Sequence, residues 1–253
     1  MSQPSFESLR LVQDEVRKHF GWSLEDDLRS VAAMASIFCG PNPYGINQWN
    51  PANRASTLKT LQDRIMASEQ LIFVGAAVEP EDIPTVKPLG TEYIVADGAV
   101  GACIDKVTPL CVVSDFDGQP YLEDAMMQRI PLILHAHGDN IDLWKHSFET
   151  WAASSYSAPI VLTHQTPEIF DGIHNVGGFT DGDRAVCFAY WCGLQHSNIK
   201  FLGYDKNTVG RWSGHTTTER KLAKLQWMED ILLMFPCYEL RDEHSKEGAS
   251  SLA

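Results

Sequence analysis

The sequence lacks the features that mark several large classes of protein. No apolar run approaches the ~18 residues that a membrane-spanning helix needs, and Met1 to Arg10 has no apolar stretch typical of a signal peptide. Basic residues are scarce, because 20 Lys and Arg stand against 33 Asp and Glu for a net charge of −13. Phosphate attraction needs clustered Lys and Arg. We therefore expect a cytoplasmic protein with no nucleic acid and no membrane among its partners.

Common nucleotide-binding and catalytic motifs are missing as well. No GxGxxG follows an apolar run, and the chain has neither a GxxxxGK[ST] loop nor a GxSxG turn. The six cysteines form no CxxC pair, which favours buried structural thiols over a zinc or redox site. Any phosphate group must therefore be held by metal and scattered cations, because no glycine loop is present to cradle it.

What is present is an ordinary globular composition of 253 residues, 44% hydrophobic and 21% charged. Leu9, Val12, Val16 and Phe20 recur at helical spacing and predict an early helix. We divide the chain into a helical N-terminal region (1–69), an α/β catalytic domain (70–240) and a polar C-terminal tail (241–253) that is expected to fray.

From Leu71 onward, short apolar runs alternate with helix-like segments. Each run is bounded by Gly, Pro, Asp or His, as buried strands are. The predicted strands are Leu71–Ala77, Tyr93–Ala96, Leu110–Val113, Pro131–Leu134, Pro159–Leu162 and Ile199–Leu202. The predicted helices are Glu123–Arg129, Leu143–Ala153, Asp183–Leu194 and Leu222–Phe235. This alternation predicts an α/β fold with a mostly parallel, Rossmann-like sheet flanked by helices, preceded by the helical N-terminal extension.

Acidic side chains follow two of the predicted strands, where ligands bind in open parallel sheets. Asp97 and Gly98 come directly after one strand, and the string Asp115-Phe116-Asp117-Gly118 follows the next. Two carboxylates two residues apart can reach one hard cation such as Mg²⁺. The alternative is an acidic turn without a ligand, because Asp and Gly favour turns in any case.

A histidine pair follows the fourth predicted strand, in the string His135-Ala136-His137-Gly138-Asp139-Asn140. The pair could bind Zn²⁺ together with His164 and Asp205 at later strand ends. The alternative, which we favour for each histidine taken alone, is a hydrogen-bonded polar residue at the edge of the sheet. The acidic pairs elsewhere favour a harder ion than zinc.

A second acidic pair lies in the string Gly177-Gly178-Phe179-Thr180-Asp181-Gly182-Asp183-Arg184, which leads into a predicted helix. Thr180 or Asp181 is a suitable helix cap, and acids favour the helix dipole. A functional interpretation is that Asp181 and Asp183 hold metal while Arg184 meets phosphate.

Taken in order, the strings Ala96-Asp97-Gly98-Ala99, Ser114–Gly118, HAHGDN, Thr163-His164-Gln165 and GFTDGDRA resemble the archaeal-type 6-hydroxymethyl-7,8-dihydropterin pyrophosphokinase family. The HAHGDN and GFTDGDRA strings are the specific part, and the resemblance runs from about Leu71 to Asp205. It implies a Mg²⁺-dependent transfer of diphosphate from ATP to the hydroxymethyl oxygen of a reduced pterin, with release of AMP, in folate or methanopterin synthesis. The family is distantly similar to thiamine pyrophosphokinases, and that analogy suggests a homodimer.

The resemblance also implies roles for individual residues. Its catalytic residues would be Asp115, Asp117, Asp181 and Asp183, and its metal ligands would be these four with Asp139. Its residues for binding ATP would be Asp97, Gly98, Asp139, Asn140, Thr180 and Arg184. Phe116, Phe179 and Asn140 are candidates for the slot of the pterin ring, with core packing or turn formation as the alternative. The general base is either one of the carboxylates or His137.

Several other functions fit parts of the same pattern. A thiamine pyrophosphokinase would use the same acids on another acceptor. A phosphatase of the haloacid dehalogenase type would use Asp115 as nucleophile, and a zinc hydrolase would use His135, His137, His164 and Asp205. A nucleotide-sugar glycosyltransferase also carries DxD pairs, and a regulatory protein would bind ATP without turnover.

Overall fold

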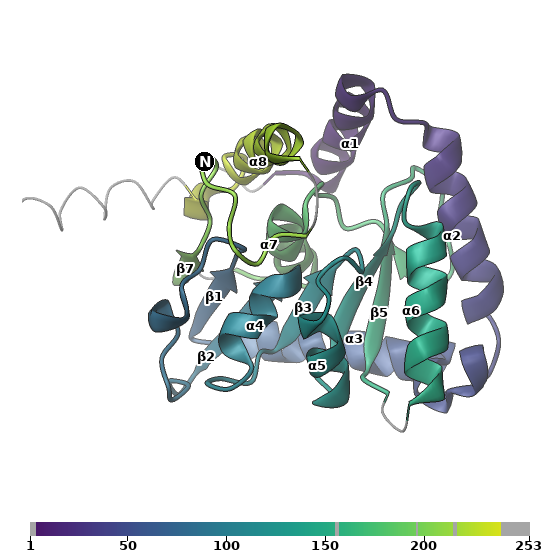
Figure 1. Cartoon of the computed structure of the whole chain (residues 1–253), viewed down its shortest axis with the longest axis horizontal. Coiled ribbons are helices and arrows are strands. Elements are labelled where there is room, and N and C mark those ends of the chain that lie inside the picture. Colours follow the sequence, from purple (N-terminus) through teal and green to yellow (C-terminus); the bar gives the residue numbers. More distant parts are fainter. Residues whose placement is uncertain (1–3, 155–156, 196, 215–216, 239–253) are drawn as a thin grey trace, which may run out of the picture.

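The computed structural model describes residues 4–154, 157–195, 197–214 and 217–238. Within these residues seven parallel strands form one sheet in the order β6-β5-β4-β3-β2-β1-β7, with helices on both faces (Figure 1). This confirms the predicted α/β fold and its N-terminal helices. The predicted C-terminal tail, 241–253, lies outside the described residues. No helix in the described ranges combines the length and apolar character that crossing a bilayer requires.

All six predicted strands are present, and the structure adds a two-residue strand that is too short to leave a signal in the sequence. The predicted first strand extends past the observed one, because Gly75 begins a turn there and its N–H pairs with Leu202 of the neighbouring strand. The strands are β1 (Gln70–Val74), β2 (Thr91–Ala96), β3 (Cys111–Ser114), β4 (Leu132–Ala136), β5 (Ile160–His164), β6 (Ile173–His174) and β7 (Ile199–Leu202).

The three α-helices before the sheet begin at side chains that accept hydrogen bonds from the first turn, namely Ser5, Ser23 and Asn50. The last helix begins earlier than predicted because Thr217 caps it. The helices are α1 (Phe6–Phe20), α2 (Leu24–Phe38), α3 (Pro51–Ala67), α4 (Val100–Cys103), α5 (Tyr121–Met127), α6 (Ile141–Ala153), α7 (Asp181–Trp191) and α8 (Thr218–Leu232).

The sheet is buried on both faces, which explains why its strands read as continuous apolar runs. In β1, Ile72 and Val74 enter one core, whereas Leu71 and Phe73 enter the other. Helices α2, α4, α5 and α6 cover the first face, and α3 and α7 cover the second (Figure 1). The N-terminal helices contribute to both cores, so residues 4–69 pack as part of the α/β unit.

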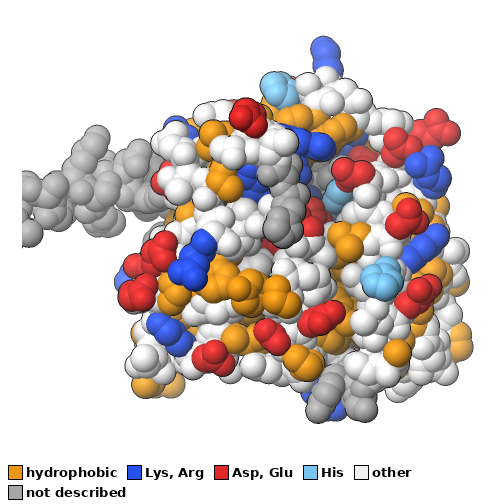
Figure 2. Space-filling view, in the orientation of Figure 1, with side chains coloured by type: hydrophobic (Ala, Val, Ile, Leu, Met, Phe, Trp, Pro, Cys, Tyr) orange, Lys and Arg blue, Asp and Glu red, His pale blue; other side chains and the backbone are white. Residues whose placement is uncertain are grey.

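The strands all point toward one edge of the sheet, where α1 and α8 lie above their carboxyl ends (Figure 1). In the same orientation, Figure 2 shows Lys and Arg side chains beside acidic and histidine side chains in this upper part of the molecule. The parallel topology therefore brings the polar strand ends together under two helices from opposite ends of the chain.

An aromatic cluster supports the first face of the sheet. The fully buried ring of Phe148 packs against six other aromatic rings, those of Phe38, Tyr44, Trp49, Phe116, Trp144 and Trp151.

We expect Phe148→Ala to lower the free energy of unfolding by about 3–5 kcal/mol, because it removes this ring and leaves a cavity. Denaturant unfolding of the purified protein measures the change. The control is Leu89→Ala, whose side chain is 99% exposed and whose loss is expected to cost less than about 0.5 kcal/mol. Equal stability of the two variants would contradict the role of the cluster.

Candidate active site

Four aspartates converge at the carboxyl edge of the sheet. Asp97 follows β2, Asp115 and Asp117 follow β3, and Asp181 lies in the first turn of α7. Each offers one carboxylate oxygen, and these four oxygens all lie within 4.8 Å of one another. We call this group the aspartate cluster. Parallel strands place their carboxyl ends at one edge, so residues distant in sequence meet there.

The turn that carries Asp115 and Asp117 is anchored in the core. Phe116 has φ +81°, which is unusual for a bulky residue and marks a strained turn. Its ring is fully buried and stacks on Trp151. Ser114 Oγ accepts a hydrogen bond from the Phe116 N–H at 2.9 Å and donates one to Asp97 Oδ1 at 2.6 Å. Phe116 is therefore a core residue, and its burial turns its two acidic neighbours outward.

Glycines let the loops close around the cluster. A Cβ at Gly118 would lie 2.4 Å from Asp97 Oδ1, and one at Gly214 would lie 2.2 Å from Asp117 Oδ2. A Cβ at Gly98 would lie 2.6 Å from the carbonyl oxygen of Trp212. Side chains at these positions would push the acids apart. Gly98 was predicted from the sequence to contact ATP, and in the structure it permits this close packing of backbone.

The crowded carboxylates of the aspartate cluster shift one another's pKa values. Burial, together with the neighbouring carboxylates, raises the pKa of Asp97 and of Asp181 well above the ordinary value. The charge of Asp115, followed by burial, raises the pKa of Asp117 to about 6. Burial alone would raise the pKa of Asp115, but the hydrogen bond and charge of His137 outweigh it and hold that pKa low. The cluster therefore favours positive charge, supplied by a proton or by a cation.

His137 is held between two carboxylates. Its Nε2 lies 3.2 Å from Asp115 Oδ2, and its Nδ1 lies 2.7 Å from Asp139 Oδ1. Burial opposes the charged imidazole, but these two hydrogen bonds prevail and raise the pKa of His137 to about 9. Asp139 itself lies outside the aspartate cluster, with its side chain 71% exposed. His137 is consequently a positively charged link between Asp139 and Asp115.

Asn140 joins the ends of two strands. Its side-chain N–H groups donate to the carbonyl oxygens of Asp115 at 3.0 Å and His135 at 2.7 Å, and its Oδ1 accepts from the His137 N–H at 3.0 Å. The sequence predicted a contact with ATP or with the pterin ring. The structure shows a residue whose amide is already used to fix the loop around Asp115.

Asp183 and Arg184 lie beneath the cluster. Asp183 Oδ2 accepts from the Thr180 N–H and hydroxyl at 3.0 and 2.9 Å, and Oδ1 accepts from the Phe179 N–H, so the carboxylate caps α7. Arg184 is 2% exposed and donates to the Phe179 carbonyl at 2.7 Å and to Asp181 Oδ1 at 3.2 Å. Asp183 was predicted to bind metal, but capping directs its carboxylate to the start of α7. Arg184 was predicted to meet phosphate, but its hydrogen bonds to Phe179 and Asp181 hold it in the interior.

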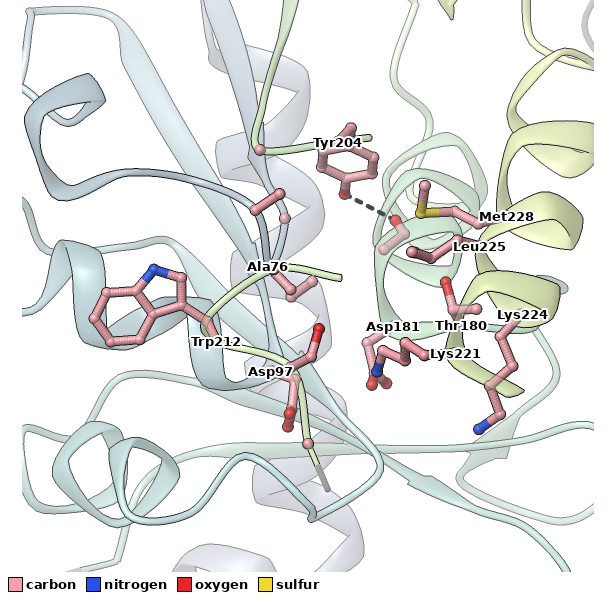
Figure 3. Close-up of a pocket in the computed structure, with 18 of the residues that line it drawn as sticks. Ala76, Asp97, Thr180, Asp181, Tyr204, Trp212, Lys221, Lys224, Leu225 and Met228 are labelled. Atoms are coloured by element: carbon pink, nitrogen blue, oxygen red, sulfur yellow. Dashed lines mark hydrogen bonds between the residues drawn. The ribbon is translucent and has the colours of Figure 1, made fainter. Parts of the chain in front are cut away.

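Two clefts meet at the aspartate cluster. The glycine-lined cleft lies beyond β1, β2 and β7, has a volume of about 770 Å³ and is lined by Gly75, Gly203 and Gly210. Tyr204, Leu225 and Met228 also line it (Figure 3). The histidine-lined cleft lies beyond β3, β4 and β5 and encloses about 830 Å³; its walls include Trp22, His137, Asp139, Asn140, Gln165 and Arg220. Asp115, Asp117, Phe179, Lys221 and Lys224 line both.

The cations Lys221 and Lys224 come from α8 and were missed in the sequence. Figure 3 shows both beside the opening, across from Asp97. Lys224 Nζ also lies 5.7 Å from the centre of the Trp22 ring and 5.8 Å from that of Phe179. A signal existed, because Arg220, Lys221 and Lys224 bring three positive charges into the first turns of one helix of an acidic protein. Only the packing of α8 above the sheet places these positive charges beside the aspartate cluster.

The histidines proposed for zinc do not form one site. His135 is fully buried between Thr163 and Gln165, and His164 Nδ1 bonds Thr166. Asp205 accepts from Asn207 and Thr208 in its own loop. Among the described residues, the aspartate cluster is the group of three or more side chains that could hold a metal. It offers only oxygen ligands, which suit a hard cation.

Asp115 has a carboxylate oxygen that such a ligand could satisfy. Its Oδ1 is buried, and among the described residues it has no hydrogen-bond partner. A buried carboxylate oxygen without a donor is costly unless a cation or water satisfies it. The cluster therefore fits a divalent cation by the chemistry of its ligands and by this unsatisfied atom.

No family model matches the chain. Three curated archaeal proteins, each named 6-hydroxymethyl-7,8-dihydropterin pyrophosphokinase, are similar to it. The protein of Pyrococcus furiosus is 30% identical over 237 residues, which cover 90% of this chain and 92% of the relative. That of Methanocaldococcus jannaschii is 27% identical over 71% and 72% of the two chains. That of Methanothermobacter thermautotrophicus is 37% identical over 46% and 47%.

The raised pKa values predict how stability depends on pH and on cations. Asp117 has a folded-state pKa of about 6 against an unfolded value of about 3.9. Its contribution to stability is therefore present below about pH 4 and is lost as pH rises through about 6. A cation replaces the lost proton, so we expect Mg²⁺ or Mn²⁺ to raise the melting temperature more at about pH 7.5 than at about pH 5. At 100 times the dissociation constant the gain is about 2.7 kcal/mol.

Thermal melts with and without the cation test this expectation. Asp117→Asn should show a smaller cation-dependent rise at about pH 7.5. Asp142→Asn is the matched control, because this exposed acid on α6 lines neither cleft. A rise that is the same at both pH values, or unchanged in Asp117→Asn, would be incompatible with a cation at the cluster.

Proposed function

The chain belongs to the 6-hydroxymethyl-7,8-dihydropterin pyrophosphokinase family, and we propose that it transfers a diphosphate group from ATP to 6-hydroxymethyl-7,8-dihydropterin. The hydroxymethyl oxygen attacks the β-phosphorus, the bond from that phosphorus to the α–β bridging oxygen breaks, and AMP leaves. The product would enter folate or methanopterin synthesis. One observation carries the proposal: two clefts meet at a single aspartate cluster, which offers a separate place for each substrate beside one cation site.

The glycine-lined cleft suits the nucleotide. The loop after β1 packs Val78 and Ile83 into one core, whereas β7 leads to α8 on the other face. The neighbouring parallel strands β1 and β7 both end at this cleft, and ligands of open α/β sheets bind beyond the carboxyl ends of the strands. Gly75 and Gly203 line it and leave room for a ligand close to the backbone.

The histidine-lined cleft suits the pterin. Trp22 and Phe179 form an aromatic wall against which a flat ring can lie. Asp139 lies at the opening with a mostly exposed carboxylate, which can accept hydrogen bonds from the amino group and ring N–H of a pterin. Phe179 belongs to the walls of both clefts, so the acceptor can approach the cluster from this side while ATP approaches from the other.

The cluster lies between the clefts, where the phosphates would be. We assign Mg²⁺ binding to Asp97, Asp115, Asp117 and Asp181, and there the ion would neutralise charge on the phosphate oxygens. Lys221 and Lys224 line both clefts and would stabilise the negative charge that moves from one substrate to the other. His137 is held as a cation by two carboxylates, so a carboxylate of the cluster is better placed to accept the hydroxyl proton.

The homodimer suggested by analogy is retained as part of the proposal. Light scattering of the purified protein would determine the state of assembly.

Removing one carboxylate from the cluster should abolish turnover. We expect Asp115→Asn and Asp181→Asn each to lower kcat by at least ~100-fold, because each removes charge that holds the cation where the phosphates react. AMP formed from ATP and 6-hydroxymethyl-7,8-dihydropterin is the measurement, and circular dichroism checks the fold. Asp142→Asn is again the control and should keep full activity.

Full activity of both cluster variants would remove the site assignment. AMP release with thiamine instead of the pterin would replace the proposed acceptor by that of a thiamine pyrophosphokinase. ATP binding without AMP release with either acceptor would indicate a regulatory nucleotide-binding protein.

The lysines of α8 should act through their charge. We expect Lys221→Gln and Lys224→Gln each to lower kcat/KM by about 10–100-fold, because one positive charge is lost beside the phosphates. Lys200→Gln is the matched control, since Lys200 is exposed on β7 and lines neither cleft. Steady-state kinetics with both substrates give the comparison. If Lys221→Gln or Lys224→Gln changes kcat/KM no more than Lys200→Gln does, the substituted lysine has no role in phosphate binding.

A further inference from the structure

A buried ionic network connects the N-terminal helices to the histidine-lined cleft. Asp27, in the first turn of α2, is only 4% exposed. Its Oδ1 accepts from the Gly138 N–H at 2.8 Å and from Gln165 Nε2 at 3.1 Å. Its Oδ2 accepts from Arg17 Nη1 at 3.1 Å and again from Gln165 Nε2, at 3.0 Å. One carboxylate thus binds α1, the loop after β4 and the loop after β5.

The loop after β4 is pressed directly onto α2. A Cβ at Gly138 would lie 2.8 Å from Asp26 Cβ and 3.4 Å from the backbone nitrogen of Asp27. A side chain at Gly138 would therefore force the loop away from the helix. The hydrogen bond from the Gly138 N–H to Asp27 depends on this close approach.

The same loop carries the residues that hold Asp115. His137, next to Gly138, places its Nε2 3.2 Å from Asp115 Oδ2, and Asn140 donates to the Asp115 carbonyl oxygen at 3.0 Å. Gln165, the second partner of Asp27, lines the histidine-lined cleft and directs its Oε1 toward His135 Nε2 at 3.2 Å. A displacement of this loop would therefore move both the aspartate cluster and one wall of the cleft.

We propose that Asp27 is a positioning residue that acts through Gly138 and His137 to hold Asp115 in the aspartate cluster and to shape the acceptor cleft. The identity of the acceptor rests on the proposed function, whereas the effect on the cluster does not. The N-terminal helices then contribute to the chemistry without touching the reacting atoms.

The partners of Asp27 explain why a carboxylate stands there. Gly138, Gln165 and Arg17 all donate, so both oxygens must accept. In Asp27→Asn one carboxylate oxygen becomes an NH₂ group, which would face N–H donors and could not accept from them. The substitution would also remove the buried negative charge that pairs with the Arg17 guanidinium. Arg17 would keep Asp14, whose side chain is 63% exposed, and the carbonyl oxygen of Gln165. Loss of Asp27 therefore loosens the loop rather than the whole of α1.

The test compares two neighbouring acids of the full-length protein, Asp27→Asn and Asp26→Asn. Asp26 is the matched control because it lies one residue away, is 45% exposed and pairs with Arg29 on the helix surface. The readouts are the affinity for Mg²⁺ by calorimetry without substrates, the KM values for ATP and for the pterin, and the melting temperature. Residues that orient metal ligands typically contribute 10–100-fold to metal affinity or activity.

We expect Asp27→Asn to weaken Mg²⁺ binding at least ~10-fold and to raise the KM for the pterin by a similar factor, with a smaller change in the KM for ATP. Asp26→Asn should behave as the unmodified protein. Gly138→Ala keeps the charge network but breaks the close contact, and it should reproduce the loss of Mg²⁺ affinity. A purely structural role would lower the melting temperature without changing affinity in the folded protein.

Unchanged Mg²⁺ affinity in folded Asp27→Asn or in folded Gly138→Ala overturns the proposal, and so does failure of both variants to fold. The outcome is separable from the proposed function because calorimetry needs no acceptor. Loss of Mg²⁺ affinity in a protein that never converts the pterin would retain the positioning role and reject the acceptor. If the protein converts the pterin but Mg²⁺ affinity is unaltered in the variants, the proposed acceptor is retained and the positioning role of Asp27 is rejected.

Discussion

Mutual repulsion among four carboxylates is the constraint on which the site depends. Asp97, Asp115, Asp117 and Asp181 place one oxygen each within 4.8 Å of all the others, an arrangement that burial makes worse. The fold holds the carboxylates together through a buried aromatic turn at Phe116 and through Gly118 and Gly214, which let the loops approach Asp97 and Asp117 closely. Four carboxylates held this close at the carboxyl ends of the strands repel one another, and a bound cation would relieve that repulsion.

Counter-charges reach this group from three directions. His137 lies on one side of Asp115 and takes a positive charge from its two carboxylate neighbours. Arg184 braces Asp181 from beneath, and Lys221 and Lys224 lie above both clefts on α8. His137 and Arg184 are committed to protein partners, whereas Lys221 and Lys224 line both clefts and Arg220 lines the histidine-lined cleft. This division separates the charges that build the cluster from those that can meet phosphate.

The arrangement of two clefts around one cluster gives diphosphate transfer its geometry. The glycine-lined cleft lies beyond the carboxyl ends of β1, β2 and β7, and the histidine-lined cleft lies beyond those of β3, β4 and β5. In the proposed function the first cleft holds the nucleotide and the second holds the acceptor. The N-terminal helices complete the second cleft through Trp22 and through the contacts of Asp27. The sequence similarity to the Pyrococcus furiosus protein covers 90% of this chain, so it includes most of the N-terminal helical region as well as the sheet.

The sequence by itself determined the strands, most of the helices and the acids that end up at the edge of the sheet. Short apolar runs and polar strand ends are local patterns, and a parallel sheet converts them into one shared edge. Only the tertiary structure decided which acids face the ligand. Asp183 lies two residues from Asp181 yet turns inward to cap its own helix, while Asp97 joins the cluster because Gly118 permits it. The packing of α8 against the rest of the fold positions Lys221 and Lys224, and the packing of α2 positions Asp27. The direction of a side chain depends on helical phase and on long-range hydrogen bonds, which no local pattern contains.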